Sequence, residues 1–381
     1  MPETLPARLA EFAASLRAAG AIRSDAVEHA FATVARHRCV PHFRYGPETI
    51  TVPQDDLPDD KVLDIVYSHQ SLLTSTGQNG GPPSSSSAPT LMARMLEALD
   101  LSPGMRVLEI GAGTGYNAAL ITTITGALVV TVDAGATTAQ GAADSIRRLG
   151  LDHHITVVRG DGYLGEPAYA PYDRIIVTCG TAGLSPHWLD QLTPDGRILA
   201  PVAHGGVHPI LAAAHHDDSA VTATAVLWAD FMPAVGPLRP AELAGHDPAD
   251  YIPPAPVTRI LDASPARTPD AYNDLWFFLA AHDPRITRAY MEDDTVDTTT
   301  GACALHTANG TAWVHHNGSI TATGQPAVAT ELRSLIHQWA TAGRPALTQF
   351  TATLAPTKTG ESLSTPSHWT VGTREPSTST P

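Results

Sequence analysis

A glycine-rich segment, Gly111-Ala112-Gly113-Thr114-Gly115, carries the clearest chemical signal in the sequence. It follows an apolar run at residues 106–110 and precedes a predicted helix. Because glycine has no side chain, a ligand can approach the backbone of such a loop closely. In a doubly wound sheet, the carboxyl end of the first strand is where cofactors bind. The loop therefore predicts a cofactor site, and the alternative interpretation is that its glycines only form turns.

Acidic residues near the ends of three predicted strands narrow the choice of ligand. Asp133 follows Gly111 at about the sequence separation that is typical of a carboxylate accepting both ribose hydroxyls. Asp161 could bind an adenine amino group. Glu109 would repel a pyrophosphate, and the G-x-G-x-G spacing differs from the G-x-G-x-x-G of dinucleotide-binding folds. S-adenosylmethionine, with its ribose, its cationic sulfonium and its amino-acid end, fits these residues. The predicted cofactor-binding residues are Glu109, Gly111, Gly113, Gly115, Asp133, Asp161 and Gly162.

The elements that must position this loop follow a regular pattern. Apolar runs predict strands at residues 106–110, 128–132, 155–158, 174–178, 197–200, 210–213 and 221–228. Between the first of these runs, apolar residues recur at helical spacing, and Gly150 marks the end of one predicted helix. Strands and helices therefore alternate along this part of the chain. This order predicts an α/β fold with a doubly wound, mostly parallel sheet.

The composition excludes several classes of protein. The chain has 381 residues, 43 % of them hydrophobic, which indicates a globular protein. With 23 basic and 38 acidic residues the net charge is −15, and without a basic patch a nucleic-acid partner is disfavoured. No apolar stretch reaches the roughly 20 residues of a membrane helix, and no signal-peptide core is evident. Three widely spaced cysteines fit a reducing compartment, so we expect a cytoplasmic location without a membrane partner.

Several blocks of residues occur in an order typical of one enzyme family. They are Phe31–Pro41, Ser87–Pro89, Leu101–Leu120, Gly160–Tyr163, Pro171–Thr178 and Phe231–Gly236. From about residue 20 to residue 238 the chain thus resembles the protein-L-isoaspartate O-methyltransferases. The resemblance implies a Rossmann-like class I methyltransferase fold, S-adenosylmethionine as methyl donor with S-adenosylhomocysteine as product, and a side-chain carboxylate of a peptide as acceptor. It also adds Asn117 to the cofactor-binding block.

Two features depart from the family pattern. The family's substrate loop reads roughly Thr-Ile-Ser-Ala-Pro-His, whereas this chain has Ser85-Ser86-Ser87-Ala88-Pro89-Thr90. The family also normally ends near the position where residues 239–381 begin. In both features the chain resembles the family members that act in the biosynthesis of ribosomally made, lanthipeptide-like peptides. Those members methylate an ordinary Asp. We therefore expect a constrained, modified precursor peptide as substrate, with general isoaspartyl repair as the alternative.

The serine run is the predicted catalytic segment. A carboxylate is already ionised at pH 7 and needs no general base, so the enzyme has to align the reacting atoms and exclude water. Ser85, Ser86 and Ser87 are the candidate catalytic residues, because their hydroxyls can orient a carboxylate without neutralising it. An Asp ester formed here would close to a succinimide and open to isoaspartate. A flexible linker is the alternative interpretation of the run.

The sequence divides into four predicted parts. Residues 1–90 hold N-terminal helices and the substrate loop, and residues 91–238 form the S-adenosylmethionine-binding core. Residues 239–355 predict a smaller α+β domain that could recognise the substrate. Residues 356–381, rich in Ser, Thr and Pro, are expected to be a disordered tail.

Other residues have simpler interpretations. Three His-His pairs begin at His153, His215 and His315, and they lack a third ligand at metal-site spacing, so no metal is predicted. Cys179 is interpreted as a packing residue. The sequence leaves open a small-molecule carboxyl methyltransferase and a non-catalytic peptide-binding protein, and it does not determine the oligomeric state.

Overall fold

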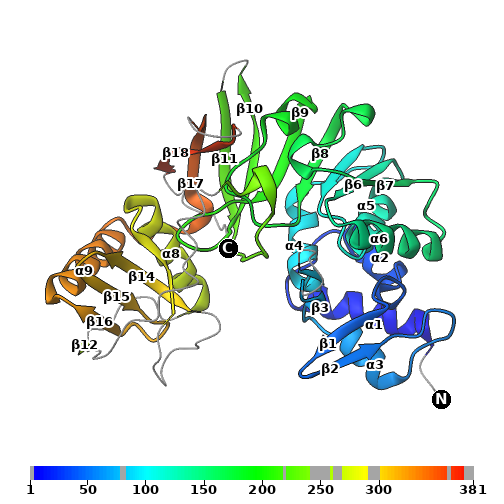
Figure 1. Cartoon of the computed structure of the whole chain (residues 1–381), viewed down its shortest axis with the longest axis horizontal. Coiled ribbons are helices and arrows are strands. Elements are labelled where there is room, and N and C mark those ends of the chain that lie inside the picture. Colours follow the sequence, from blue (N-terminus) through cyan, green and yellow to red (C-terminus); the bar gives the residue numbers. More distant parts are fainter. Residues whose placement is uncertain are drawn as a thin grey trace, which may run out of the picture.

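A nine-stranded mixed sheet dominates the structure (Figure 1). The computed structural model describes residues 4–77, 83–217, 220–240, 258–260, 268–290, 301–357 and 362–372. The sheet has the strand order β18-β17-β11-β10-β9-β8-β5-β6-β7. Its strands are β5 (Val107–Ile110), β6 (Val129–Asp133), β7 (Ile155–Arg159), β8 (Tyr172–Val177), β9 (Leu192–Pro201), β10 (Ile210–Asp217), β11 (Ala220–Leu227), β17 (Phe350–Pro356) and β18 (Ser364–Val371).

The half of the sheet from β7 to β9 is parallel, and β5 lies between β6 and β8 within it. Neighbouring residues of these strands face different cores. Val107 and Ile176 belong to a core shared with the N-terminal helices, whereas Leu108 and Ile175 belong to a core shared with the C-terminal part of the chain. Because both faces are covered, the strands are continuous apolar runs, as parallel strands usually are. The predicted α/β fold with a doubly wound sheet and an additional domain is confirmed.

Helices connect the parallel strands. They are α4 (Pro89–Leu99) before β5, α5 (Tyr116–Thr125) after it, α6 (Ala136–Leu149) after β6 and the short α7 (Pro186–Asp190) after β8. Gly150 ends α6 at a φ of 72°, a left-handed conformation that favours glycine, as the sequence predicts.

The other half of the sheet is antiparallel and ends in the last strands of the chain. β11 pairs with β17, and β17 pairs with β18. The expectation of a disordered tail from residue 356 is therefore wrong for Ser364–Val371. Leu363 is fully buried just before this strand, and Trp369 packs against the core. The Ser- and Thr-rich composition does not indicate a strand. The contacts of Leu363 and Trp369 with the core hold this strand in place.

A smaller α+β unit lies between β11 and β17 along the chain. Its sheet has the order β12-β16-β15-β14-β13. The strands are β12 (Thr258–Ile260), β13 (Ile286–Ala289), β14 (Ala302–Thr307), β15 (Gly310–Val314) and β16 (Ile320–Gly324), and the helices are α8 (Pro269–His282) and α9 (Pro326–Thr341). Turns at Asn309-Gly310 and Asn317-Gly318 connect β14 to β15 and β15 to β16. Phe277 of α8 and Leu332 of α9 join the same core as the large sheet, so the two units pack together.

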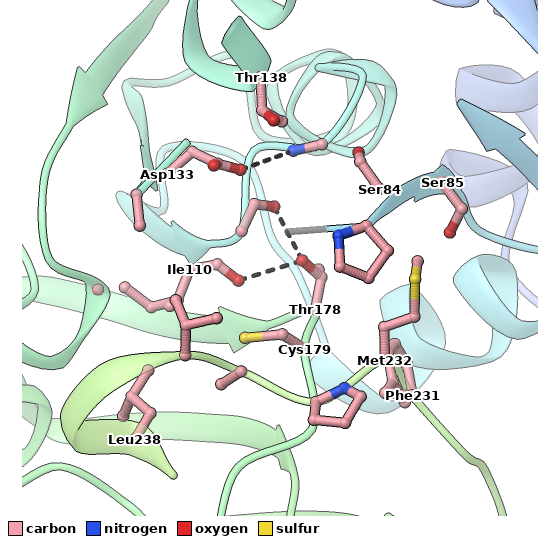
Figure 2. A pocket seen from close by; sticks show the side chains of 18 of the residues that line it. Ser84, Ser85, Ile110, Asp133, Thr138, Thr178, Cys179, Phe231, Met232 and Leu238 are labelled. Carbon is pink, nitrogen blue, oxygen red and sulfur yellow. Dashed lines mark hydrogen bonds between the residues drawn. The ribbon is translucent and has the colours of Figure 1, made fainter. Parts of the chain in front are cut away.

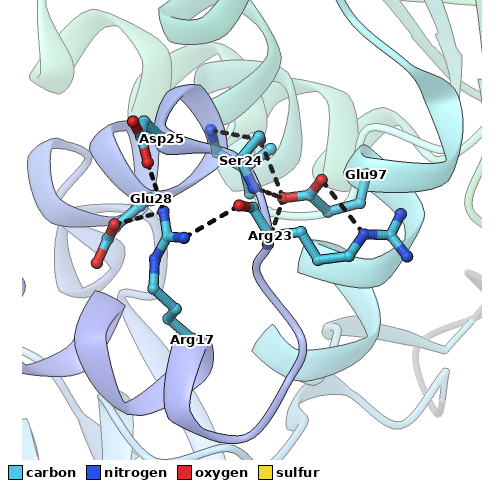
Figure 3. A network of polar contacts seen from close by, with 7 residues as sticks. Arg17, Arg23, Ser24, Asp25, Glu28 and Glu97 are labelled. Carbon is cyan, nitrogen blue, oxygen red and sulfur yellow. Dashed lines mark hydrogen bonds and ion pairs between the residues drawn. The ribbon is translucent and has the colours of Figure 1, made fainter. Parts of the chain in front are cut away.

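The N-terminal helices α1 (Leu5–Ala18) and α2 (Asp25–Thr33) are tied to α4 by a polar network (Figure 3). The buried carboxylate of Glu97 on α4 accepts hydrogen bonds from the backbone N–H groups of Arg23 and Ser24, each at 2.8 Å. Ser24 also caps α2, because its hydroxyl accepts from Val27 N. Arg17 of α1 pairs with Asp25 and Glu28 of α2. The network holds both helices against the element that follows the serine run.

The described residues at 46–77 and 83–90 form more regular structure than the Pro and Gly content of this stretch suggests. It holds β2 (Glu48–Thr51), paired with β1 (His42–Tyr45), then α3 (Asp60–Val66), β3 (Leu72–Ser75) and β4 (Ser84–Ser86). β4 pairs antiparallel with β3 in a two-stranded sheet. The serine run is therefore partly a strand, with its backbone fixed by pairing, and the flexible-linker interpretation is wrong for Ser84–Ser86.

Candidate active site

A cavity of about 890 Å³ opens at the carboxyl ends of β5, β6, β7 and β8 (Figure 2). Its size is within the range of small-molecule sites. Three kinds of segment form its walls: the glycine loop with the acids that follow the strands, the serine run, and a stretch after β11. The lining residues include Ser84, Ser85, Ser87, Ile110, Gly111, Gly113, Asp133, Thr138, Asp161, Gly162, Thr178 and Cys179, together with residues 230–238.

The glycine loop has a backbone that only glycine accommodates at its first position. Gly111 has a φ of 98°, and a Cβ there would lie 2.4 Å from Thr178 Oγ1. The Thr178 hydroxyl instead lies 2.8 Å from the carbonyl oxygen of Gly111, to which it donates (Figure 2). Gly115 starts α5 at a φ of 78° and packs closely on Ala142 of α6. The structure thus requires these two glycines, and Gly111 and Gly113 line the cavity.

Asp133 lies at the end of β6 with its carboxylate at the cavity. Its Oδ1 accepts from Gly135 N at 2.9 Å and its Oδ2 from Gly113 N at 3.3 Å. Burial raises the pKa of Asp133, although the backbone N–H groups of Gly135 and Gly113 oppose the shift. Figure 2 shows the carboxylate beside the glycine loop, on the same side of the cavity as Thr138.

The third strand end also contributes to the cavity, as the sequence predicts. Asp161 and Gly162 follow β7 and line the cavity. Asp161 caps a short 3₁₀ turn at residues 162–164, because its Oδ1 accepts from Tyr163 N at 3.0 Å. A Cβ at Gly162 would lie 2.7 Å from Ile110 Cγ2, so the turn can press directly onto the first strand.

Glu109, Asn117 and Gly115 lie behind the cavity wall and are not among its lining residues. Glu109 is fully buried, and its carboxylate accepts from Asn117 Nδ2 at 2.8 Å and from Thr131 Oγ1 at 2.6 Å. Burial raises the pKa of Glu109 to about 7, against the effect of these two hydrogen bonds. In the structure these three residues shape the glycine loop, and their direct contact with the cofactor stays a prediction.

The candidate catalytic serines divide between two sides of β4. Ser85 and Ser87, together with Ser84, line the cavity. Ser86 does not, because it is buried and its Oγ lies 3.3 Å from Arg36 Nε, which donates to it. Ser86 is thus set apart from its neighbours by its contact with Arg36. A Cβ at Gly113 would lie 3.5 Å from Ser85 O, so the serine run passes directly over the glycine loop.

Arg36 belongs to the site region, although the sequence analysis assigns no role to it within the Phe31–Pro41 block. It is fully buried, and its guanidinium donates to a cage of backbone carbonyl oxygens. These belong to Val66, Ser68, Gln70, Ser86 and Ser87, at distances of 2.7 to 3.4 Å. Burial lowers the pKa of Arg36 to about 10, so the side chain is still cationic at neutral pH. The cage fixes the serine run to the segment after α3. The signal for this role of Arg36 is the burial of a charged side chain, which is visible only in the structure.

A stretch at residues 231–238, here named the wall strip, forms the side of the cavity opposite the glycine loop. It docks beside Cys179 and Gly180, because Gly180 N donates to Met232 O at 2.9 Å and Ala234 N donates to Gly180 O at 2.7 Å. Cys179 lines the cavity, and burial raises its thiol pKa to about 12. The thiol is therefore protonated at neutral pH and poorly suited to be a nucleophile, in agreement with its interpretation as a packing residue.

The residues at the cavity fit S-adenosylmethionine. Asp133 and Asp161 present carboxylates that can accept from hydroxyl and amino groups, and Gly111 and Gly113 leave space beside their backbone. The volume exceeds what one such cofactor needs, which leaves room for an acceptor group. Among the described residues no cluster of three metal-ligating side chains occurs, and none of the described helices combines the length and the hydropathy of a membrane span.

Comparison with known proteins agrees with this site. The family model of protein-L-isoaspartate(D-aspartate) O-methyltransferases matches residues 8–238. The protein-L-isoaspartate O-methyltransferase of Methanopyrus kandleri is 36 % identical over 189 residues, which cover 49 % of this chain and 73 % of the relative. The one of Thermotoga maritima is 40 % identical over 144 residues, so the chain spans less than half, 45 %, of that relative.

A solved structure extends the similarity to the C-terminal unit. This structure, of a protein-L-isoaspartate O-methyltransferase, is 25 % identical to the chain, with a TM-score of 0.55. The match covers 95 % of this chain and 98 % of the other. The resemblance predicted from the sequence is thereby confirmed at the level of the family. The chain belongs to the protein-L-isoaspartate O-methyltransferase family and is an S-adenosylmethionine-dependent carboxyl methyltransferase.

Proposed function

We propose that the protein methylates the side-chain carboxylate of an Asp in a ribosomally made, modified peptide. The observation that carries this proposal is the serine run, in which Ser84, Ser85 and Ser87 line the cavity above the glycine loop. A loop of this composition differs from the substrate loop typical of isoaspartate repair. The proposal therefore concerns the identity of the methyl acceptor, because membership of the family already gives carboxyl methylation as the class of reaction.

The residues of the chain serve to hold and orient the acceptor. S-adenosylmethionine, when bound, supplies a methyl group on a cationic sulfur that leaves as a neutral thioether. An Asp carboxylate is ionised at pH 7 and needs no base. The hydroxyls of Ser85 and Ser87 can donate to one of its oxygens and leave the other free to form the new O–CH₃ bond. Fixing this geometry is the main source of rate enhancement expected here.

The later steps need no residue of the enzyme. In the methylated peptide, the backbone nitrogen of the next residue attacks the ester carbonyl. Methanol leaves, the nitrogen loses its proton, and a succinimide forms. Water then opens the ring to isoaspartate or aspartate. The aspartate formed in this way can be methylated again, so repeated cycles convert the residue to isoaspartate, the proposed end product.

General repair of isoaspartyl residues is a second candidate function, and a specific observation favours it. The solved structure that shares the C-terminal unit bears the name protein-L-isoaspartate O-methyltransferase. The C-terminal extension therefore does not distinguish the two functions. The serine run alone separates them.

The test uses four peptides that differ only in Asp or isoaspartate and in a linear or ring-constrained form. Each is incubated with the full-length protein and S-adenosylmethionine and followed by mass spectrometry. On the constrained Asp peptide we expect the gain of one methylene, followed by a species that has lost one water relative to the starting peptide. Methylation of linear isoaspartyl peptide alone would refute the proposal and establish repair. Calorimetric binding of S-adenosylhomocysteine serves as the control that the protein is folded.

A further inference from the structure

The wall strip is held at its two ends by different parts of the chain. Its backbone from Met232 onward docks on the segment after β8, where Gly180 N donates to Met232 O and Ala182 N donates to Leu238 O, each at 2.9 Å. Its beginning follows Asp230, which lies at the cavity and is held by its side chain. Figure 2 shows Phe231 and Met232 on the side of Ser85, whereas Leu238 lies on the side of Ile110. The beginning of the strip therefore faces the acceptor end of the cavity.

Asp230 is held by two side chains. Its Oδ1 lies 3.0 Å from His208 Nδ1, and its Oδ2 accepts from Arg288 Nη1 at 2.5 Å. Burial opposes the ionisation of Asp230, but the hydrogen bond from His208 and the charge of Arg288 keep its pKa below the ordinary value. His208 lies just before β10 and packs against Gly180, where a Cβ would be 2.5 Å from the ring.

Arg288 belongs to β13 of the smaller unit, 58 residues beyond Asp230. Two glycines make room for it. Gly206, at a φ of 82°, lies so close that a Cβ would be 2.3 Å from Arg288 N, and a Cβ at Gly301 would be 2.8 Å from Arg288 Cγ. The side chain of Arg288 is mostly buried, with about 18 % exposed. A partly buried, directly paired arginine is fixed in position more firmly than an exposed one.

We propose that the smaller unit positions the acceptor end of the cavity through Arg288, which holds Asp230 and with it the beginning of the wall strip. This inference rests on the proposed function only in that the acceptor is a peptide carboxylate. Arg288 acts through Asp230 and is a positioning residue. The C-terminal unit thereby contributes to peptide binding at a site that none of its described side chains lines.

The test compares Arg288→Gln and Arg288→Lys with Arg285→Gln in the full-length protein. Arg285 is the matched control, because it lies three residues earlier and pairs with Asp283 and Glu331 inside the smaller unit. Hydrogen–deuterium exchange of the peptide that covers residues 231–238 reports the strip directly. We expect faster exchange in Arg288→Gln, partial recovery in Arg288→Lys and no change in Arg285→Gln.

The kinetic measurement uses the peptide that the wild-type protein methylates. We expect Arg288→Gln to raise the KM for this peptide about tenfold, with kcat and the Kd of S-adenosylhomocysteine nearly unchanged. Unchanged exchange of the strip would overturn the inference whether or not a peptide substrate is found. Faster exchange with an unchanged KM would also overturn it. If the wild-type protein methylates no peptide, the proposed function fails, and the exchange experiment still decides whether Arg288 holds the strip.

Discussion

Asn117 Nδ2 lies 2.8 Å from Glu109 Oε1, and this hydrogen bond joins the strand before the glycine loop to the helix after it. Thr131 of β6 donates to the other oxygen of the same carboxylate. One buried acid therefore connects β5, α5 and β6 at the point where the cofactor site is built. The side chain thus acts on the shape of the glycine loop from behind the cavity wall.

The ionisation of Glu109 predicts a pH dependence of stability. Burial raises its pKa from 4.5 to about 7 in the folded protein, so the folded state holds this proton after the unfolded state has lost it. Stability from this group is fully present below pH 4.5 and is lost as the pH rises to about 7. Relative to the wild type, Glu109→Gln should therefore gain stability over this window, by up to about 3 kcal/mol. Urea unfolding at several pH values measures it, and parallel pH profiles would contradict the shift.

The serines should separate into two functional classes. Ser85→Ala and Ser87→Ala remove hydroxyls at the cavity, so kcat/KM for the peptide should fall about tenfold or more while the melting temperature changes little. Ser86→Ala is the matched control. It removes an acceptor of Arg36 Nε and should lower stability by about 1 kcal/mol or more. Equal kinetic effects of all three variants would contradict the separation of Ser86 from the serines that line the cavity.

Arg36 should be essential for the stability of the acceptor side. In Arg36→Met, five backbone carbonyl oxygens lose their donor, and we expect a loss of more than about 3 kcal/mol in chemical unfolding. Arg36→Lys keeps the charge but has fewer donors and should recover only part of the loss. Arg38→Met, two residues away and less buried, is the control and should be nearly neutral. A small effect of Arg36→Met would show that the cage contributes little.

Asp133 should control the affinity for the cofactor. Asp133→Asn keeps the shape but removes the charge, and we expect the Kd of S-adenosylhomocysteine to rise about tenfold to a hundredfold. Isothermal titration calorimetry measures this directly. Asp144→Asn, on the exposed side of α6 where Asp144 pairs with Arg147, should bind normally. An unchanged Kd for Asp133→Asn would remove this residue from the cofactor site.

The sequence predicts the parallel half of the fold well for a physical reason. Strands such as β5 and β8 are buried on both faces and therefore appear as short apolar runs, and stops such as Gly150 mark the helices between them. β18 could not be predicted in this way, because its residues are half-buried or exposed. The strand depends on pairing with β17 and on the burial of Leu363. Strand β4 could not be predicted either, because serine has little preference for strands.

The site could be predicted where it follows from the ends of strands. Gly111, Asp133 and Asp161 come together because parallel strands end at one edge of the sheet. The direction of Glu109 and Ser86 depends on partners that are distant in sequence, Thr131 and Arg36, and local spacing cannot reveal them. The link between Arg288 and Asp230 depends on the packing of the two units, which no motif encodes.

The return of the chain to the large sheet makes the smaller unit an insertion with two covalent attachments (Figure 1). A truncation after residue 239 would remove β17 and β18 as well, and it would uncover the edge of β11. Exposed strand edges promote aggregation, so such a fragment would fail for reasons unrelated to peptide recognition. An informative deletion instead replaces the inserted unit by a short linker before Phe350 and keeps the last two strands in place. Because Phe277 and Leu332 share the core of the large sheet, such a deletion also needs polar replacements on the face that the unit covers.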